Sequence, residues 1–156
     1  MIERLISNEI EIRCSPEQLY DYVTQPWCWH EWHPSSLSAR SDVDVLHEGD
    51  HFDEHIVLRP LSPLPLALHR QTRYLVNQAR RPTDFEVHGE TRDGGLTIRY
   101  RLTATELGTR FRRDLTYQVR GPVQLIEPLL LYPRMKALSR VALSNLKTKL
   151  ELACGQ

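Results

Sequence analysis

Residues 96–119 read LTIRYRLTATELGTRFRRDLTYQV, and this stretch carries the clearest pattern in the chain. Two runs of alternating polar and apolar residues, 96–105 and 109–119, flank a short link, 106–108, that ends in Gly108. Such alternation is typical of strands with one face in a core, and a short link containing glycine is typical of a hairpin. The stretch therefore predicts an antiparallel hairpin with one apolar, covered face.

One charged residue falls on the inner face of this hairpin. The apolar residues of that face are Ile98, Tyr100, Leu102, Ala104, Phe111, Leu115, Tyr117 and Val119. Arg113 has the same parity, which places it opposite Leu102 unless a bulge turns it outward. Because a buried unpaired charge costs several kcal/mol, this guanidinium must find an anion or reach water. Arg113 either anchors a ligand carboxylate or enolate, or extends to the rim and pairs with an acid such as Glu90.

Further strands are predicted on both sides of the hairpin. Residues 50–58, 69–77 and 83–91 also alternate, and Asp93-Gly94-Gly95 is a turn signal between two strands. Near the N-terminus, residues 3–13 alternate with one change of face around residues 7–9. We therefore expect an antiparallel sheet of about six to seven strands.

Helices are predicted at two places. Ser15-Pro16-Glu17-Gln18 combines an N-cap, a proline at the first helical position and a capping box, and a second short helix starts at Pro26. After residue 122 the period becomes helical, and an uninterrupted helix is expected over about 134–152 because Pro128 and Pro133 break its first half. The apolar stripe of this region is Leu125, Leu129, Met135, Leu138, Ala142, Leu146, Leu150 and Ala153. The chain is thus predicted to be an α+β protein in which this helix covers the sheet.

The residues that punctuate this order carry a family resemblance. They are Ser15-Pro16-Glu17, Trp29-x-x-Trp32-His33-Pro34, Gly49-Asp50-x-Phe52, Pro82 before Phe85, Gly108-Thr109-Arg110-Phe111, and Tyr117 with Gly121-Pro122. Over nearly the whole chain this pattern resembles the START-related and polyketide-cyclase-like (SRPBCC) superfamily. The resemblance implies a helix-grip fold, in which the sheet wraps around the C-terminal helix and leaves a cavity between them. Because that superfamily contains lipid carriers, pigment and hormone binders and cyclases, it leaves the function open.

The implied cavity supplies the candidate ligand-binding residues. They are Trp32, His33, Phe52, Ile56, Tyr74, Phe85, Tyr100, Arg113, Leu115, Tyr117, Met135 and Leu138. An apolar space with a few hydroxyl groups suits a small hydrophobic or aromatic molecule, lipid-like or polyketide-like. The alternative is that these side chains fill a solid core. A polyketide cyclase or dehydratase would need only positioned acids and bases, such as His33, Tyr100, Arg113 and Tyr117.

Composition limits the other classes of function. The 156 residues suit one domain, 1–156, and twenty basic residues balance twenty acidic ones, which argues against nucleic-acid binding. Three cysteines without a CxxC pair make a disulfide framework or zinc ribbon unlikely and favour a reducing compartment. The N-terminus has no apolar signal-peptide region, and no apolar run is long enough to cross a bilayer, so we expect a cytoplasmic protein.

Two groups of residues that contain histidine have the spacing of metal ligands. His30 and His33 have HxxH spacing, and His51, Asp53 and His55 share one face of a predicted strand. The alternation that places Phe52 inside places this trio outside, so a solvated polar face is expected. We therefore predict no metal and no cofactor, and the sequence contains no nucleophile, phosphate-loop or dinucleotide motif.

The segment Leu61–Leu68 is too apolar for an ordinary solvated loop. It either packs as a lid over the cavity or forms an exposed patch that meets a partner or a membrane surface. An interaction module without a small ligand is therefore a further alternative. The chain is expected to be a monomer or a homodimer.

Overall fold

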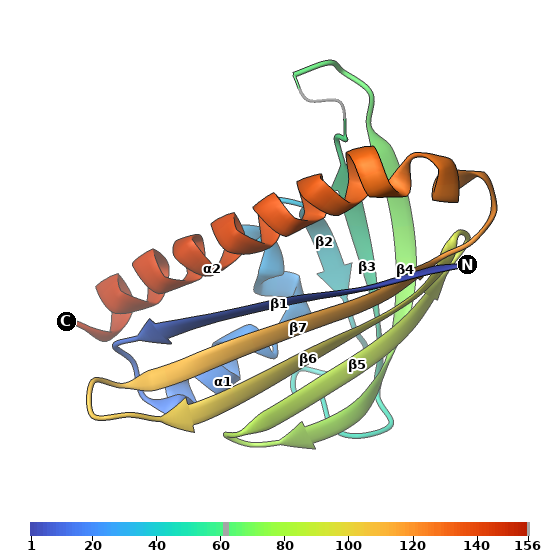
Figure 1. The fold of residues 1–156 in the computed structure, drawn as a ribbon. Helices are drawn as coiled ribbons and strands as arrows, with labels where there is room; N and C mark the ends of the chain where they lie inside the picture. Colours follow the sequence, from blue (N-terminus) through green and yellow to red (C-terminus); the bar gives the residue numbers. More distant parts are fainter. Residues whose placement is uncertain (61–62, 156) are drawn as a thin grey trace.

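A seven-stranded antiparallel sheet and a long C-terminal helix form the computed structural model, which describes residues 1–60 and 63–155. The strands are β1 (Ile2–Ile12), β2 (Ser36–Arg40), β3 (His51–Leu58), β4 (Leu68–Arg80), β5 (Asp84–Thr91), β6 (Gly94–Ala104) and β7 (Thr109–Val119). The helical segments are α1 (Pro16–Val23), η1 (Pro26–Glu31), η2 (Gly121–Leu125), η3 (Glu127–Leu131) and α2 (Tyr132–Cys154). The strand order is β1-β7-β6-β5-β4-β3-β2. Figure 1 shows this sheet curving around α2, which confirms the predicted helix-grip architecture.

The β6–β7 hairpin has the predicted inner face but a different register at Arg113. Ala104 pairs with Thr109, so the turn spans residues 105–108 and Arg113 lies opposite Tyr100 instead of Leu102. Gly108, with φ +153°, is required in this turn because a Cβ there would lie 2.3 Å from the carbonyl oxygen of Ile12. The pairing of β6 with β7 contains no bulge, so Arg113 keeps the inward direction that its parity predicts.

Strand β1 corrects the predicted change of face. It pairs with β7 in one unbroken register from Ile2 to Ile12. Even-numbered residues therefore face the core throughout, with Ile6 and Ile12 buried, while Leu5 is 58% exposed. An unbroken register cannot shift the parity of side chains, so Arg4 shares the inner face.

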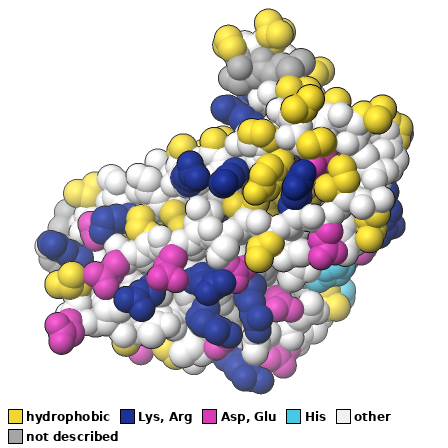
Figure 2. All heavy atoms as spheres, in the orientation of Figure 1, with side chains coloured by type: hydrophobic (Ala, Val, Ile, Leu, Met, Phe, Trp, Pro, Cys, Tyr) yellow, Lys and Arg dark blue, Asp and Glu magenta, His cyan; other side chains and the backbone are white. Residues whose placement is uncertain are grey.

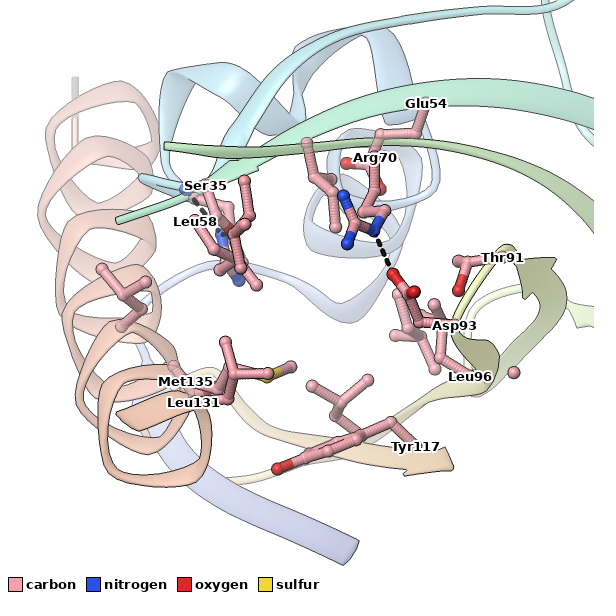
Figure 3. A pocket seen from close by; sticks show the side chains of 18 of the residues that line it. Ser35, Glu54, Leu58, Arg70, Thr91, Asp93, Leu96, Tyr117, Leu131 and Met135 are labelled. Carbon is pink, nitrogen blue, oxygen red and sulfur yellow. Dashed lines mark hydrogen bonds and ion pairs between the residues drawn. The ribbon is translucent and has the colours of Figure 1, made fainter. Parts of the chain in front are cut away.

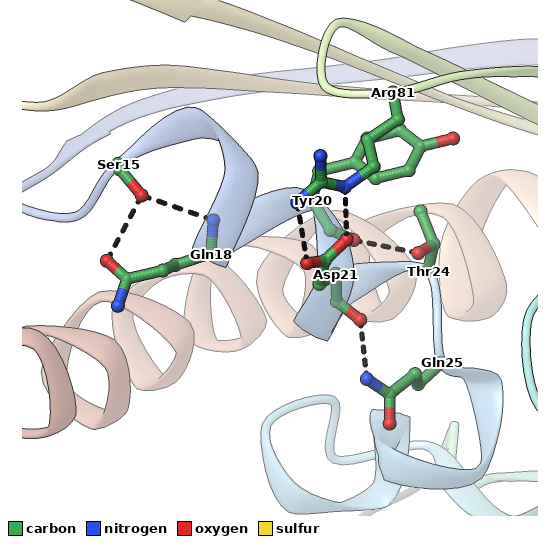
Figure 4. A network of polar contacts seen from close by, with 7 residues as sticks. All are labelled: Ser15, Gln18, Tyr20, Asp21, Thr24, Gln25 and Arg81. Atoms are coloured by element: carbon green, nitrogen blue, oxygen red, sulfur yellow. Dashed lines mark hydrogen bonds and ion pairs between the residues drawn. The ribbon is translucent and has the colours of Figure 1, made fainter.

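Helix α1 begins where its capping residues predict. The Ser15 side chain accepts a hydrogen bond from the Gln18 backbone N–H at 3.2 Å, and Pro16 occupies the first turn. Figure 4 shows this cap together with the ion pair that connects α1 to the residues after β4. Arg81, directly after β4, donates from Nε and Nη2 to the carboxylate of Asp21 in α1 at 2.8 and 3.0 Å. This ion pair, together with the buried apolar face of α1, connects the helix to the sheet.

Helix α2 begins at Tyr132, slightly before the predicted start, because Pro133 fits in the first turn of a helix. Its buried face contains Ala142, Leu143, Leu146 and Leu150. The predicted stripe is wrong at Leu125 and Leu129, which are 82% and 80% exposed, and at Ala153, which is exposed in the last turn of α2. Leu125 and Leu129 belong to the 3-10 helix η2 and the π-helix η3, whose periods differ from that of an α-helix.

Cys14 and Cys154 form a disulfide, with a Cα–Cα distance of 5.6 Å. The cysteine count and spacing made a disulfide framework unlikely, and the structure differs from that expectation by this one bond. The pair is separated by 140 residues and joins the link after β1 to the last turn of α2. Wide spacing along the sequence therefore concealed a close contact in space, while Cys28 is free.

Candidate functional site

A cavity of about 140 Å³ lies between the concave face of the sheet and α2. An engineered cavity of about 150 Å³ in another protein holds one benzene molecule, so this space suits one aromatic ring or a short aliphatic chain. Figure 3 shows Met135 and Leu131 on the helical side of the cavity, across from Tyr117 and Leu96 of the sheet. The space is therefore walled by apolar side chains from both layers.

Most of the predicted site residues meet at this cavity. Its lining includes Trp32, His33, Ile56, Tyr74, Tyr100, Arg113, Leu115, Tyr117, Met135 and Leu138. Other side chains that line the cavity were not predicted from the sequence, among them Ser35, Glu54, Leu58, Arg70, Leu96, Leu131 and Ser139. The structure thus brings these side chains together, and their contact with a ligand stays a prediction.

Phe52 and Phe85, by contrast, do not line the cavity. The Phe52 ring stacks on Tyr74 at 4.8 Å between centroids and meets the edge of Trp29 at 5.5 Å. The Phe85 ring meets Tyr20 edge-on at 6.4 Å. Both rings therefore pack against residues of η1 and α1 and lie outside the cavity lining, and their contact with a ligand stays a prediction.

Arg113 is buried, with only 4% of its surface exposed. Its Nη1 donates to Ser139 Oγ of α2 at 3.3 Å, and its Nε has no partner among the described residues. The predicted alternative, extension to the rim and pairing with Glu90, is not what the structure contains. Glu90 instead lies 3.9 Å from Arg120. The guanidinium therefore stays inside the cavity without a carboxylate partner in the described part of the chain.

Glu54 is a second charged residue of the cavity, and it was not predicted from the sequence. It shares the inward parity of Ile56 on β3, which is the signal that would have identified it. Ser36 Oγ donates to its Oε2 at 2.7 Å, and the Tyr74 hydroxyl donates to its Oε1 at 3.3 Å. Burial raises the pKa of Glu54 to about 7, although these two hydrogen bonds and the charge of Arg113 act in the opposite direction. Glu54 can therefore gain or lose a proton near neutral pH.

His33 is a further polar residue of the cavity lining, and it belongs to the link between η1 and β2. Burial and the positive charge of Arg113 lower the pKa of His33 well below its usual 6.5, so the ring is neutral. Nδ1 lies 3.2 Å from the Ser35 backbone nitrogen and 2.9 Å from Ser35 Oγ. Arg113 Nη2, which can only donate, lies 3.4 Å from Nε2, so it donates to Nε2 in the tautomer that has its hydrogen on Nδ1.

The Tyr117 hydroxyl is already engaged. It donates to Glu127 Oε1 at 2.7 Å, and Arg4 Nε and Nη2 donate to the same carboxylate at 2.9 and 3.1 Å. Glu127 is fully buried, and the Arg4 guanidinium lies over the Tyr132 ring at 4.5 Å. This cluster was not predicted from the sequence, and it holds the segment before α2 against β1 and β7. Tyr117 consequently offers the cavity its ring and not a free hydroxyl.

Another ion pair lines the cavity where β4 begins. Figure 3 shows Arg70 of β4 reaching Asp93, which lies in the turn between β5 and β6, and Arg70 Nε donates to the Asp93 carboxylate.

The segment that was expected to be a lid, Leu61–Leu68, is described in part, because residues 61–62 lie outside the described residues. Among the described residues of this segment, Leu68 lines the cavity and residues 63–67 do not. The lid interpretation stays a prediction.

Comparison with known proteins identifies the family. The sequence profile described as polyketide cyclase/dehydrase and lipid transport matches residues 4–151. The chain belongs to this family. That assignment confirms the resemblance to the SRPBCC superfamily, and family membership supports binding of a hydrophobic ligand in the cavity. A search of curated proteins finds no significant match.

Solved structures share the fold of this family member. A protein from Thermus thermophilus has a TM-score of 0.72 at 15% identity, covering 96% of this chain and 99% of its own. The Zhui aromatase/cyclase from Streptomyces sp. R1128 has a TM-score of 0.69 at 9% identity, with coverage of 96% and 94%. The di-domain ARO/CYC StfQ from the steffimycin biosynthetic pathway has a TM-score of 0.71 at 16% identity, with coverage of 99% and 53%. At such low identity, these likenesses establish the fold alone.

The histidine trio of this family member does not form a joint site. His51, Asp53 and His55 lie on the outer face of β3, where Asp53 pairs with Arg73 at 3.1 Å and His55 contacts His69 at 2.9 Å. Across residues 1–60 and 63–155, no three metal-ligating side chains converge. Within the same residues, no helix has the length and apolar character needed to cross a membrane.

Proposed function

We propose that residues 1–156 form one domain that binds a small hydrophobic or aromatic molecule, lipid-like or polyketide-like, between the sheet and α2. The observation that carries this proposal is a cavity with apolar walls and one buried polar end. Apolar ligand surface gains about 25 cal/mol per Å² when it leaves water, which gives such walls their affinity. A few well-placed polar groups then orient the ligand.

The two ends of the cavity have different roles in this proposal. The apolar body of the ligand packs against Ile56, Leu115, Met135 and Leu138, all of which line the space. A polar group of the ligand meets Arg113, whose guanidinium is buried beside α2. A buried charge destabilises the protein unless a partner completes its hydrogen bonds.

A cyclase or dehydratase activity on a polyketide-like substrate is the second candidate. The observation that favours it is Glu54, because burial raises its pKa to about 7, where a carboxyl group serves as acid and as base. Turnover requires a carbonyl of the substrate near Arg113 and an exchangeable proton near Glu54. Loss of turnover in Glu54→Gln with retained binding would support catalysis, whereas binding without turnover of any polyketide-like compound would support a carrier.

The surface suggests where such a protein meets other molecules. Leu64 and Leu66 in the β3–β4 loop are 60% and 48% exposed, and Figure 2 shows hydrophobic side chains gathered on this loop. Contact of the Leu61–Leu68 segment with a membrane surface is part of the proposal. A monomeric or homodimeric state is also part of the proposal; a cytoplasmic location is not, because disulfides such as Cys14–Cys154 are rare in reducing compartments. Vesicle sedimentation and analytical ultracentrifugation of Leu64→Ser and Leu66→Ser variants test the first two.

Native mass spectrometry of freshly purified protein, followed by solvent extraction, tests the binding proposal. We expect a co-purifying apolar molecule that is lost in Leu138→Trp, where the larger ring fills the cavity. Val141→Trp is the matched control, because Val141 is 46% exposed on the same helix and does not line the cavity. Thermal melts confirm that both variants are folded. Protein without bound mass, whose melting temperature no aromatic or lipid-like compound raises, would contradict the proposal.

A further inference from the structure

The polar end of the cavity has more hydrogen-bond donors than acceptors. Arg113 Nε and Trp32 Nε1 are buried without a partner among the described residues. The other two guanidinium nitrogens make only long contacts, Nη1 with Ser139 Oγ at 3.3 Å and Nη2 with His33 Nε2 at 3.4 Å. Because a buried donor without a partner is costly, an acceptor is missing beside Arg113 Nε and Trp32 Nε1.

Charge at this end of the cavity is also unbalanced. Arg113 is permanently positive, and in the described part of the chain it makes no ion pair with a carboxylate. The two oxygens of Glu54, the nearby acid, already accept from Ser36 and Tyr74. An oxygen anion would satisfy both the missing acceptor and the missing charge.

We propose that the ligand binds as an anion, a hydrophobic body with a carboxylate, enolate or phenolate oxygen, and that Glu54 takes up a proton when this oxygen reaches Arg113. The inference rests on the proposed function and narrows its ligand class. The ligand oxygen accepts from Arg113, and the proton comes from solvent. The positive charge of Arg113 stabilises the Glu54 carboxylate. When a ligand anion neutralises that charge, the pKa of Glu54 rises and the carboxylate takes up a proton.

Other titratable groups around Glu54 are poor proton acceptors. Burial and the charge of Arg113 lower the pKa of His33, so its ring stays neutral. Burial raises the pKa values of Tyr74 and Tyr100, so both phenols are already protonated at neutral pH. The proton therefore goes to the Glu54 carboxylate, because Arg113 is already fully protonated.

Isothermal titration calorimetry with a matched pair of probes tests this inference. 4-Propylbenzoate and its neutral amide, 4-propylbenzamide, have one ring and nearly the same shape, as the cavity volume requires. Titration in two buffers with different ionisation heats measures the protons taken up. We expect the carboxylate to bind at least ~10-fold more tightly, with uptake of about half a proton at pH 7 and about one at pH 8.

Three variants assign these effects to residues. Glu54→Gln should bind the carboxylate without proton uptake, so its affinity should be the same at pH 6 and pH 8. Arg113→Gln should lose the preference for the carboxylate over the amide. Arg112→Gln is the matched control, because Arg112 is next in the chain but lies on the outer face, where it pairs with Asp114 at 3.1 Å.

The outcomes separate this inference from the proposed function. Equal affinity for the two probes, or proton uptake that persists in Glu54→Gln, would overturn the inference and leave hydrophobic binding intact. Failure of both probes to bind, in a protein that also retains no molecule on purification, would overturn both. If Arg113→Gln does not fold, the probe comparison and Glu54→Gln decide the question alone.

Discussion

Replacing Glu54 with Gln should change the pH dependence of stability in a direction that burial determines. Burial raises the pKa of Glu54 from its ordinary 4.5 to about 7, so between these values the folded protein binds a proton that the unfolded chain has released. The free energy of unfolding then falls as pH rises through this window and levels off above it. At about 1.4 kcal/mol per pKa unit, the total loss is about 3 kcal/mol. Glutamine keeps a similar shape and has no charge to desolvate, so Glu54→Gln should lack this loss.

Urea unfolding of both proteins at several pH values from 4 to 8 measures the effect. The difference in unfolding free energy between Glu54→Gln and the parent protein should shift by about 3 kcal/mol in favour of the variant across this range. Glu106→Gln, at an exposed turn, is the control and should show no such shift. A flat difference for Glu54→Gln would refute the conclusion that the Glu54 carboxylate is desolvated in the folded protein.

Three further predictions concern the framework around the cavity. Leu146→Ala should lower the unfolding free energy by about 2–5 kcal/mol because Leu146 is fully buried, whereas Val141→Ala on the exposed face of α2 should change it by less than about 0.5 kcal/mol; equal effects in urea unfolding would contradict this packing. Gly94→Ala should cost at least about 1–3 kcal/mol, because φ is +153° and a Cβ would lie 1.8 Å from a backbone oxygen of β7; an unchanged melting temperature would refute it. Reducing the Cys14–Cys154 disulfide should lower the unfolding free energy by about 2–4 kcal/mol. A Cys28→Ser variant is the control and should respond to the reductant in the same way, because Cys28 is not in the bond. An unfolding free energy that does not change on reduction would argue against the bond.

Parity along strands accounts for most of what the sequence predicted about the site. The inward position of Arg113 follows from the alternation of β7, and the structure contains no bulge that would reverse it. The same rule places Glu54 inward on β3, although a charged residue is easily assigned to the solvent face. The prediction was wrong for the first half of β1. Leu5 was taken to face the core, which required a change of face farther along the strand, whereas Leu5 is exposed and Arg4 faces inward.

Contacts between distant segments could not be predicted in this way. Glu127 is buried because Arg4 and Tyr117 converge on it from two neighbouring strands. Cys14 meets Cys154 because α2 crosses the sheet and ends beside the link after β1. Each of these contacts depends on where a helix crosses the sheet, and no local pattern records that position.

The sequence by itself determined the order of the elements, the apolar faces of the strands and the start of α1, because periods of 2 and 3.6 residues and capping residues act locally. Only the tertiary structure decided which inward residues line a cavity and which are core. Phe52 and Tyr74 have the same kind of sequence signal, yet Phe52 is covered while Tyr74 also reaches the cavity. The physical reason is that a side chain's direction depends on its own strand, whereas its neighbours depend on how α1, η1 and α2 pack across the sheet.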